Sequence, residues 1–317
     1  MFVMMKYSLM NVGWAVFRTI AWLFPLNILF KLGSLCAKVY FYLDTELKRT
    51  LIKELHTIFM DKSAQEINEI ALRSLIIYFK RQVENVIYGK LTKEYLKKMV
   101  FIEGLGNLDK GLDNGKGVII LLSHFGSFLL ILPALAFKGY SISQITGSPH
   151  LKNERVTSKK LSTIRQREYD RLPIKFLRAD KSLYSAFKAL KRNELVAITL
   201  DGRTGSKWLP VKIFNSRAFL APGPIRIAMK TGAAIIPTFI IRNIDNTHRL
   251  VLEQPFEIKN YETEDETISA NLQGLAEIFE RYVYKYPCHY GMILKVMRVR
   301  AKKGIIDCSL LPEGNDE

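Results

Sequence analysis

Cysteine is scarce in this chain of 317 residues, which contains only three, far apart: Cys36, Cys288 and Cys308. Three scattered thiols exclude a disulfide framework and a CxxC metal site, and they suit a reducing compartment. The 19 glycines and 11 prolines are too few for a collagen-like or low-complexity chain. The sequence has neither a Walker motif nor histidines and cysteines at metal-ligand spacing. We therefore expect no metal and no resident cofactor.

Long uncharged runs are also missing from an otherwise apolar N-terminus. The segment 7–43 carries only three charges: Arg18, Lys31 and Lys38. Its longest uncharged runs, 7–17 and 19–30, are shorter than the ~20 residues that a membrane-spanning helix needs. Sparse cations and scattered aromatic residues on an apolar body are typical of helices that lie in a bilayer interface. We expect residues 1–45 to associate with a membrane, peripherally or as a single pass. The alternative is a buried helix pair in a soluble core.

Acidic residues are too few to balance the basic ones. The chain has 47 Lys and Arg against 30 Asp and Glu, a formal net charge of +17. Such an excess favours an anionic partner. Two basic runs, 152–181 and 295–303, suit an anionic membrane surface or an acidic acyl-carrier protein, although such runs are often only solvated. No helix-turn-helix, zinc finger or aromatic RNA-binding signature occurs, so we expect no nucleic acid partner.

Strand-like and helix-like segments alternate through the middle of the chain. Residues 118–123 form a continuous apolar run, typical of a central strand covered by helices on both faces. The other predicted strands are 99–103, 196–200, 234–241 and 250–252. Helical patterns are found over 47–87, 128–137, 154–169, 182–191, 223–230 and 268–286. This alternation predicts an α/β fold in which a largely parallel central sheet is flanked by helices.

One of the five histidines, His124, stands directly past the end of a predicted central strand. Active sites of open α/β sheets lie in the crevice at that edge. Gly126 and Ser127 follow, at a predicted helix start whose unpaired N–H groups can hold an oxyanion. Gly126 would also let a ligand approach the backbone closely. A base beside an oxyanion pocket is the minimum equipment for acyl transfer. The simpler alternative is a histidine that only caps a strand.

The stretch 101–128, FIEGLGNLDKGLDNGKGVIILLSHFGSF, carries a family resemblance. It resembles the lipid A biosynthesis acyltransferase family of the lysophospholipid acyltransferase superfamily, which typically shows "G-x-GVIL" and then "HFGNWE". The resemblance covers about residues 12–298. It implies a lysophospholipid acyltransferase-like fold and acyl transfer from an acyl-carrier protein or coenzyme A thioester to a hydroxyl of a membrane lipid. It also implies a place on the cytoplasmic face of the bacterial inner membrane.

The chain departs from this family at the motif acid. The family has His, four residues, then Glu or Asp, and counting from His124 gives Leu129. An aliphatic side chain cannot orient the imidazole or stabilise its protonated form. Loss of the acid function in a serine-protease triad lowers the rate by ~10⁴. Asp201 is the best substitute because it also ends an apolar strand at the same edge. The alternative is that Asp201 is only a turn residue before Gly202.

A family arginine is missing as well. It usually ends the strand after the motif helix, but the matching run 144–149 has none. Arg165 and Arg203 would supply positive charge to a substrate phosphate instead. For Arg165 the alternative is a solvated surface side chain.

These observations predict a membrane-associated acyltransferase. His124 would be the general base, Asp201 its acid partner, and the N–H groups of Gly126 and Ser127 the oxyanion donors. We expect a membrane-associating segment over 1–45, an acyltransferase-like domain over 46–310 and a flexible acidic tail over 311–317. One alternative is a non-catalytic lipid- or acyl-carrier-binding homologue that lost the motif acid. The other is an acyltransferase recruited to a non-lipid-A acceptor.

Overall fold

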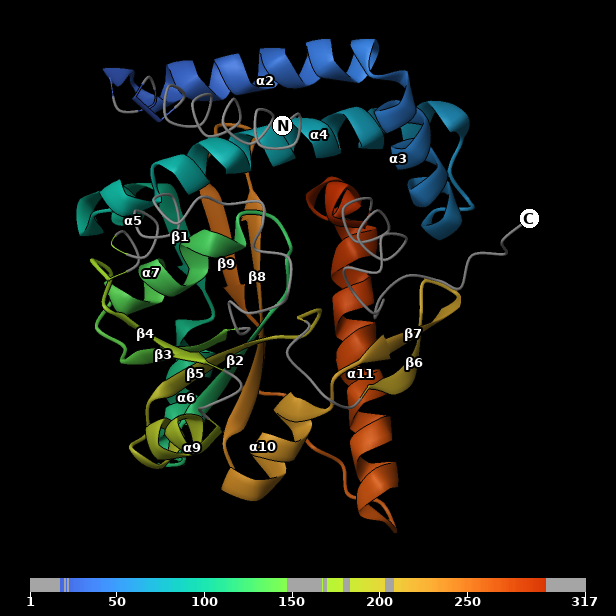
Figure 1. Ribbon diagram of the computed structural model, residues 1–317. Helices are drawn as coiled ribbons and strands as arrows, with labels where there is room; N and C mark the ends of the chain where they lie inside the picture. Colours follow the sequence, from blue (N-terminus) through green and yellow to red (C-terminus); the bar gives the residue numbers. More distant parts are fainter. Residues whose placement is uncertain are drawn as a thin grey trace, which may run out of the picture.

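A seven-stranded sheet forms the centre of the protein (Figure 1). The computed structural model describes residues 18–19, 21, 23–146, 167, 170–178, 183–202 and 208–294. The strand order is β1-β9-β8-β2-β5-β3-β4. Their bounds are β1 Val100–Glu103, β2 Val118–Leu122, β3 Ile142–Thr146, β4 Ile174–Arg178, β5 Leu195–Thr199, β8 Ala234–Arg242 and β9 His248–Leu252.

The sheet is largely parallel, which confirms the predicted fold class. Strands β8, β2, β5, β3 and β4 run in one direction, whereas β9 is antiparallel to β8 and β1 is parallel to β9. All five residues of β2 are buried. Because successive side chains of a strand point to opposite faces, Ile119 and Leu121 join one apolar core and Ile120 and Leu122 the other.

Helices cover both faces of the sheet. On one face lie α5 (Lys93–Met99), α6 (Leu105–Asp113) and α7 (Ile131–Ala136). On the other lie α9 (Leu183–Lys191), α10 (Gly223–Thr231) and α11 (Glu264–Lys285). Beside α11 lies the antiparallel hairpin of β6 (Leu209–Ile213) and β7 (Ser216–Leu220) (Figure 1).

Three N-terminal helices close the end of the molecule where the site lies. They are α2 (Leu26–Leu43), α3 (Thr45–Ile58) and α4 (Ala64–Val86), and α2 runs alongside α4 (Figure 1). A capping box of Ser63 and Glu66 starts α4. Helix α2 buries one face, which includes Phe30 and Phe41 at 1% and 0% exposure. Its opposite face is apolar and exposed.

The helix predicted over 128–137 begins differently in the structure. The predicted helix 128–137 is not continuous, because the chain first forms a 3-10 turn, Phe128–Leu130, and only then α7. The α-helix therefore begins later than expected, beyond Gly126 and Ser127.

The predicted helix 154–169 lies outside the described residues except for Arg167, and so does the acidic tail 311–317. The domain boundaries remain predictions.

Candidate active site

The parallel strands β2 and β5 bring His124 and Asp201 together. Both residues follow the carboxyl ends of their strands, and Leu122 is paired with Thr199 in the register. The Nδ1 atom of His124 lies 3.0 Å from Oδ1 of Asp201. The backbone N–H of His124 also donates to both carboxylate oxygens, at 3.1 Å each. This confirms the predicted placement of the two side chains within hydrogen-bond distance.

Asp201 is fully buried, whereas the His124 side chain is 36% exposed. Tyr290, also buried, donates its hydroxyl to Oδ2 of Asp201 at 3.0 Å. Burial opposes ionisation, but the charge of His124 and hydrogen bonds from His124 and Tyr290 outweigh it, so the pKa of Asp201 lies below its usual range. An ionised carboxylate accepts a hydrogen bond from Nδ1–H, which leaves Nε2 as the basic nitrogen of His124.

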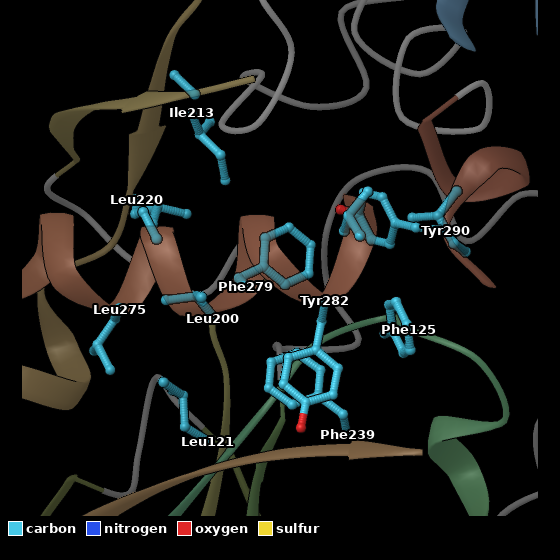
Figure 2. Close-up of a cluster of buried hydrophobic side chains, with 14 of the residues drawn as sticks. Leu121, Phe125, Leu200, Ile213, Leu220, Phe239, Leu275, Phe279, Tyr282 and Tyr290 are labelled. Atoms are coloured by element: carbon cyan, nitrogen blue, oxygen red, sulfur yellow. The ribbon is translucent and has the colours of Figure 1, made fainter. Parts of the chain in front are cut away.

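The four residues 124–127, here termed the motif turn, are anchored by Phe125 in the core. Its ring stacks on His289 with centroids 5.4 Å apart and meets Phe239 edge-on at 5.7 Å. Figure 2 shows Phe125 beside Tyr282 of α11 and Tyr290 beside Phe279 of the same helix. The turn that carries His124 is therefore fixed by buried aromatic contacts.

Gly126 is required for a reason other than the one expected. Its φ of +56° is in the left-handed region, and a Cβ there would lie 2.1 Å from the carbonyl oxygen of Ile240. Strand β8 continues past the end of β2, so its backbone packs against the turn. The Gly126 N–H donates to the carbonyl oxygen of His289 at 3.0 Å. The close approach is thus made by the protein itself, and this N–H is not available to an oxyanion.

Ser127 is fully buried and its hydroxyl belongs to a polar cluster behind the turn. Its Oγ accepts a hydrogen bond from Nη2 of Arg242 at 3.1 Å and lies 3.2 Å from Nε2 of His248. Glu84 of α4 pairs with both of these residues. The sequence analysis missed Glu84, Arg242 and His248. One signal was present, because Arg242 ends an apolar strand at the same edge as His124.

A cavity of about 230 Å³ lies near the carboxyl ends of β2 and β5, and neither His124 nor Asp201 lines it. Phe128 lines it and meets the His124 ring edge-on at 4.9 Å. Leu129, at the position of the family acid, is partly buried and also lines it, so its expected apolar surroundings are confirmed. The other lining residues are Tyr88, Leu122, Leu132, Gln144, Thr146, Phe176 and Thr199.

The two arginines expected to bind phosphate, Arg165 and Arg203, lie outside the described residues. Within the described part of the chain, Arg81 of α4 brings positive charge near the site. Its guanidinium lies 5.5 Å from the centroid of the Phe128 ring. In the same part of the chain, no three His, Cys, Asp or Glu side chains are grouped as metal ligands.

Two comparisons with known proteins bear on the family of the chain. A family model described as bacterial lipid A biosynthesis acyltransferase matches residues 1–298. A search of curated proteins found no match.

Proposed function

Because the chain belongs to the bacterial lipid A biosynthesis acyltransferase family, we propose that it moves a fatty acyl group from an acyl thioester to a hydroxyl of a lipid or glycolipid acceptor. Membership makes the chain an acyltransferase. The observation that carries the finer proposal is the 3.0 Å contact between His124 and Asp201. It supplies the base and the carboxylate that this chemistry needs, even though Leu129 replaces the family acid. A paired carboxylate also argues against a non-catalytic homologue.

The proposed reaction proceeds by general-base catalysis. Nε2 of His124 takes the proton of the acceptor hydroxyl as its oxygen attacks the thioester carbonyl carbon. Asp201 stabilises the imidazolium that forms, by analogy with the acid of a Ser-His-Asp triad. The tetrahedral intermediate then collapses, the C–S bond breaks, and the thiolate takes the proton back from His124. The products are an ester and a free thiol.

The oxyanion donor is proposed to be the Ser127 N–H, since that of Gly126 is occupied. Because Ser127 is fully buried, the turn must move for a substrate to reach this N–H. Among the described residues the Ser127 N–H has no acceptor. A backbone donor aimed at the developing charge is worth about 10²–10³ in kcat. We place the acyl chain in the cavity lined by Leu129, Leu132 and Phe176. Arg165 and Arg203 remain the proposed partners of a substrate phosphate.

We propose that the protein acts at the cytoplasmic face of the bacterial inner membrane. Helix α2 is long and apolar enough to cross a bilayer by length and composition. Its burial on α4 supports a peripheral position, with the opposite face in the lipid interface. That face carries Ile28, Leu32, Leu35, Val39 and Leu43, which are 42–76% exposed. Lys31 and Lys38 are exposed on the same helix and would contact anionic headgroups.

The proposal is tested with purified full-length protein, labelled acyl-carrier protein or acyl coenzyme A, and membrane lipid acceptors. We expect the wild type to form an acylated lipid and His124→Ala to lose about 10²–10⁴-fold in kcat. His56→Ala is the matched control, because His56 is exposed on α3. A folded His124→Ala variant with wild-type transfer would refute the base assignment. Labelling of a non-lipid-A acceptor would identify a recruited acyltransferase.

A further inference from the structure

A buried ionic cluster lies directly behind the motif turn. It consists of Glu84 from α4, Arg242 from the end of β8, His248 from the start of β9 and Ser127. Oε1 of Glu84 accepts from Nη2 of Arg242 and lies 3.1 Å from Nε2 of His248. None of the four residues is more than 7% exposed. The cluster therefore connects helix α4 and strands β8 and β9 to the turn that carries His124.

Fold stability is a poor explanation for this cluster. Buried ion pairs lose solvation, and well-packed apolar residues of similar volume often replace them with no loss of stability. Among the described residues, Oε2 of Glu84 and Nε and Nη1 of Arg242 have no hydrogen-bond partner. A partly satisfied buried network stabilises less than a complete one. The cluster needs a role other than stability.

Arg242 contacts the motif turn directly at Ser127 and indirectly through His289. Its side chain donates to the Ser127 hydroxyl at 3.1 Å, and its backbone N–H donates to Nε2 of His289 at 2.9 Å. His289 in turn accepts the Gly126 N–H and stacks on Phe125. The next residue, Tyr290, donates to Asp201. Arg242 is thus connected to the turn that carries the base and, through 289–290, to the acid.

The site has particular need of such a connection. In the family pattern the acid follows His124 after four residues of the same segment, but here Leu129 occupies that position. The base on the motif turn must instead meet a carboxylate after β5, a separate strand. The relative position of the motif turn and the chain after β5 therefore sets the distance and angle between His124 and Asp201. A misplacement of about 1 Å in a catalytic site costs about 10²-fold in rate.

We propose that Arg242, held by Glu84 and His248, is a positioning residue for acyl transfer that fixes the motif turn so that His124 meets Asp201. It acts through Ser127 and His289 and does not touch the substrate. This inference rests on the proposed function of His124 and Asp201.

The test is the double variant Glu84→Leu with Arg242→Met, which removes both buried charges and fills their volume. We expect a thermal midpoint close to that of wild type, a kcat lower by about 10²-fold and little change in KM for either substrate. Arg242→Lys keeps the positive charge but replaces the planar, forked guanidinium with a single ammonium. We expect its kcat to lie between those of the double variant and the wild type. Lys80→Met is the matched control, because Lys80 is a neighbouring cation that donates to Asn246 instead.

A second readout does not depend on acyl transfer. In protein with ¹⁵N-labelled histidine, the Nδ1–H of His124 should give a hydrogen-bonded proton signal, assigned by its loss in Asp201→Asn. We expect the double variant to shift or broaden it and Lys80→Met to leave it unchanged. If wild type transfers no acyl group, the proposed function fails while this signal still reports positioning.

Ser127→Ala covers the case in which the double variant does not fold. It removes only the hydroxyl that Arg242 holds, and we expect about a tenfold loss of kcat with a displaced His124 signal. A folded double variant, or a folded Ser127→Ala variant, with wild-type kcat and an unchanged signal would overturn the proposal.

Discussion

His124 meets its carboxylate across two neighbouring strands, not along one turn of chain. Asp201 provides more than one contact, because it also accepts the backbone N–H of His124 and the hydroxyl of Tyr290. These bonds keep a fully buried carboxylate ionised and its pKa low. Asp201, which follows β5, therefore gives the imidazole the carboxylate partner that Leu129 cannot supply.

The side chain of His289 makes the free energy of unfolding depend on pH. Burial and the nearby charge of Arg242 lower the pKa of His289 to about 4 in the folded protein, from an ordinary 6.5. The unfolded chain therefore binds more protons between these two values, and the free energy of unfolding falls as the pH drops through them. At one pKa unit per about 1.4 kcal/mol, the loss between pH 7 and pH 5 is about 2 kcal/mol.

Urea denaturation at pH 7 and at pH 5 measures this loss. His289→Gln can still accept the Arg242 N–H but does not titrate. Its free energy of unfolding should therefore fall by about 2 kcal/mol less than that of wild type between pH 7 and pH 5. The depressed pKa values of Asp201 and Glu84 cause a loss only at lower pH, below the ordinary carboxyl range. The same pH dependence in His289→Gln as in wild type would contradict this account.

At the scale of elements, the segments that could be predicted are those with a strong local pattern. In the run 118–123 every residue up to Leu122 is apolar, which predicts a strand covered on both faces, and β2 is one. Because β2 and β5 are parallel, the prediction that His124 and Asp201 share one edge followed from strand ends alone.

Other elements had no such local signal. Strands β3 and β4 are only partly apolar, and the β6–β7 hairpin turns at Phe214 and Asn215, which both have positive φ without being glycine. The contact of Glu84 with Arg242 joins residues 158 positions apart, which no local periodicity can indicate. The role expected of Gly126 failed for the same reason, since the backbone of β8 that packs on it comes from far along the chain.

The exposed apolar side chains of helix α2 are expected to bind the membrane. Leu32 and Val39 are 45% and 49% exposed, so glutamate at both positions stays solvated and should leave the fold intact. Loss of two apolar side chains from a lipid interface, at about 1.5 kcal/mol each, weakens binding by about 10²-fold.

Cosedimentation with vesicles of phosphatidylethanolamine and phosphatidylglycerol measures this binding. Tyr261→Glu is the matched control, because Tyr261 is 51% exposed and precedes the end of α11 that lies away from α2 (Figure 1). Equal binding of wild type and the Leu32→Glu, Val39→Glu variant would exclude α2 as the lipid-facing element.

At the scale of the whole molecule, α2, the helix proposed to face lipid, lies next to the edge of the sheet that carries the proposed active site. The guanidinium of Arg242 lies 5.0 Å from the centroid of Phe30, on the buried face of α2. The same arginine contacts the motif turn. A lipid hydroxyl at the bilayer surface would therefore reach His124 over a short distance. The net charge of +17 favours binding to an anionic leaflet.

The central claim is that Asp201 has taken over the work of the missing motif acid, and the kcat of Asp201→Asn tests it most directly. Asparagine keeps the shape of the side chain but cannot stabilise the imidazolium, so we expect kcat for acyl transfer to fall by about 10²–10⁴-fold. Asp113→Asn, which removes an exposed carboxylate at the end of α6, should retain wild-type kcat. A folded Asp201→Asn variant with wild-type kcat would contradict the claim.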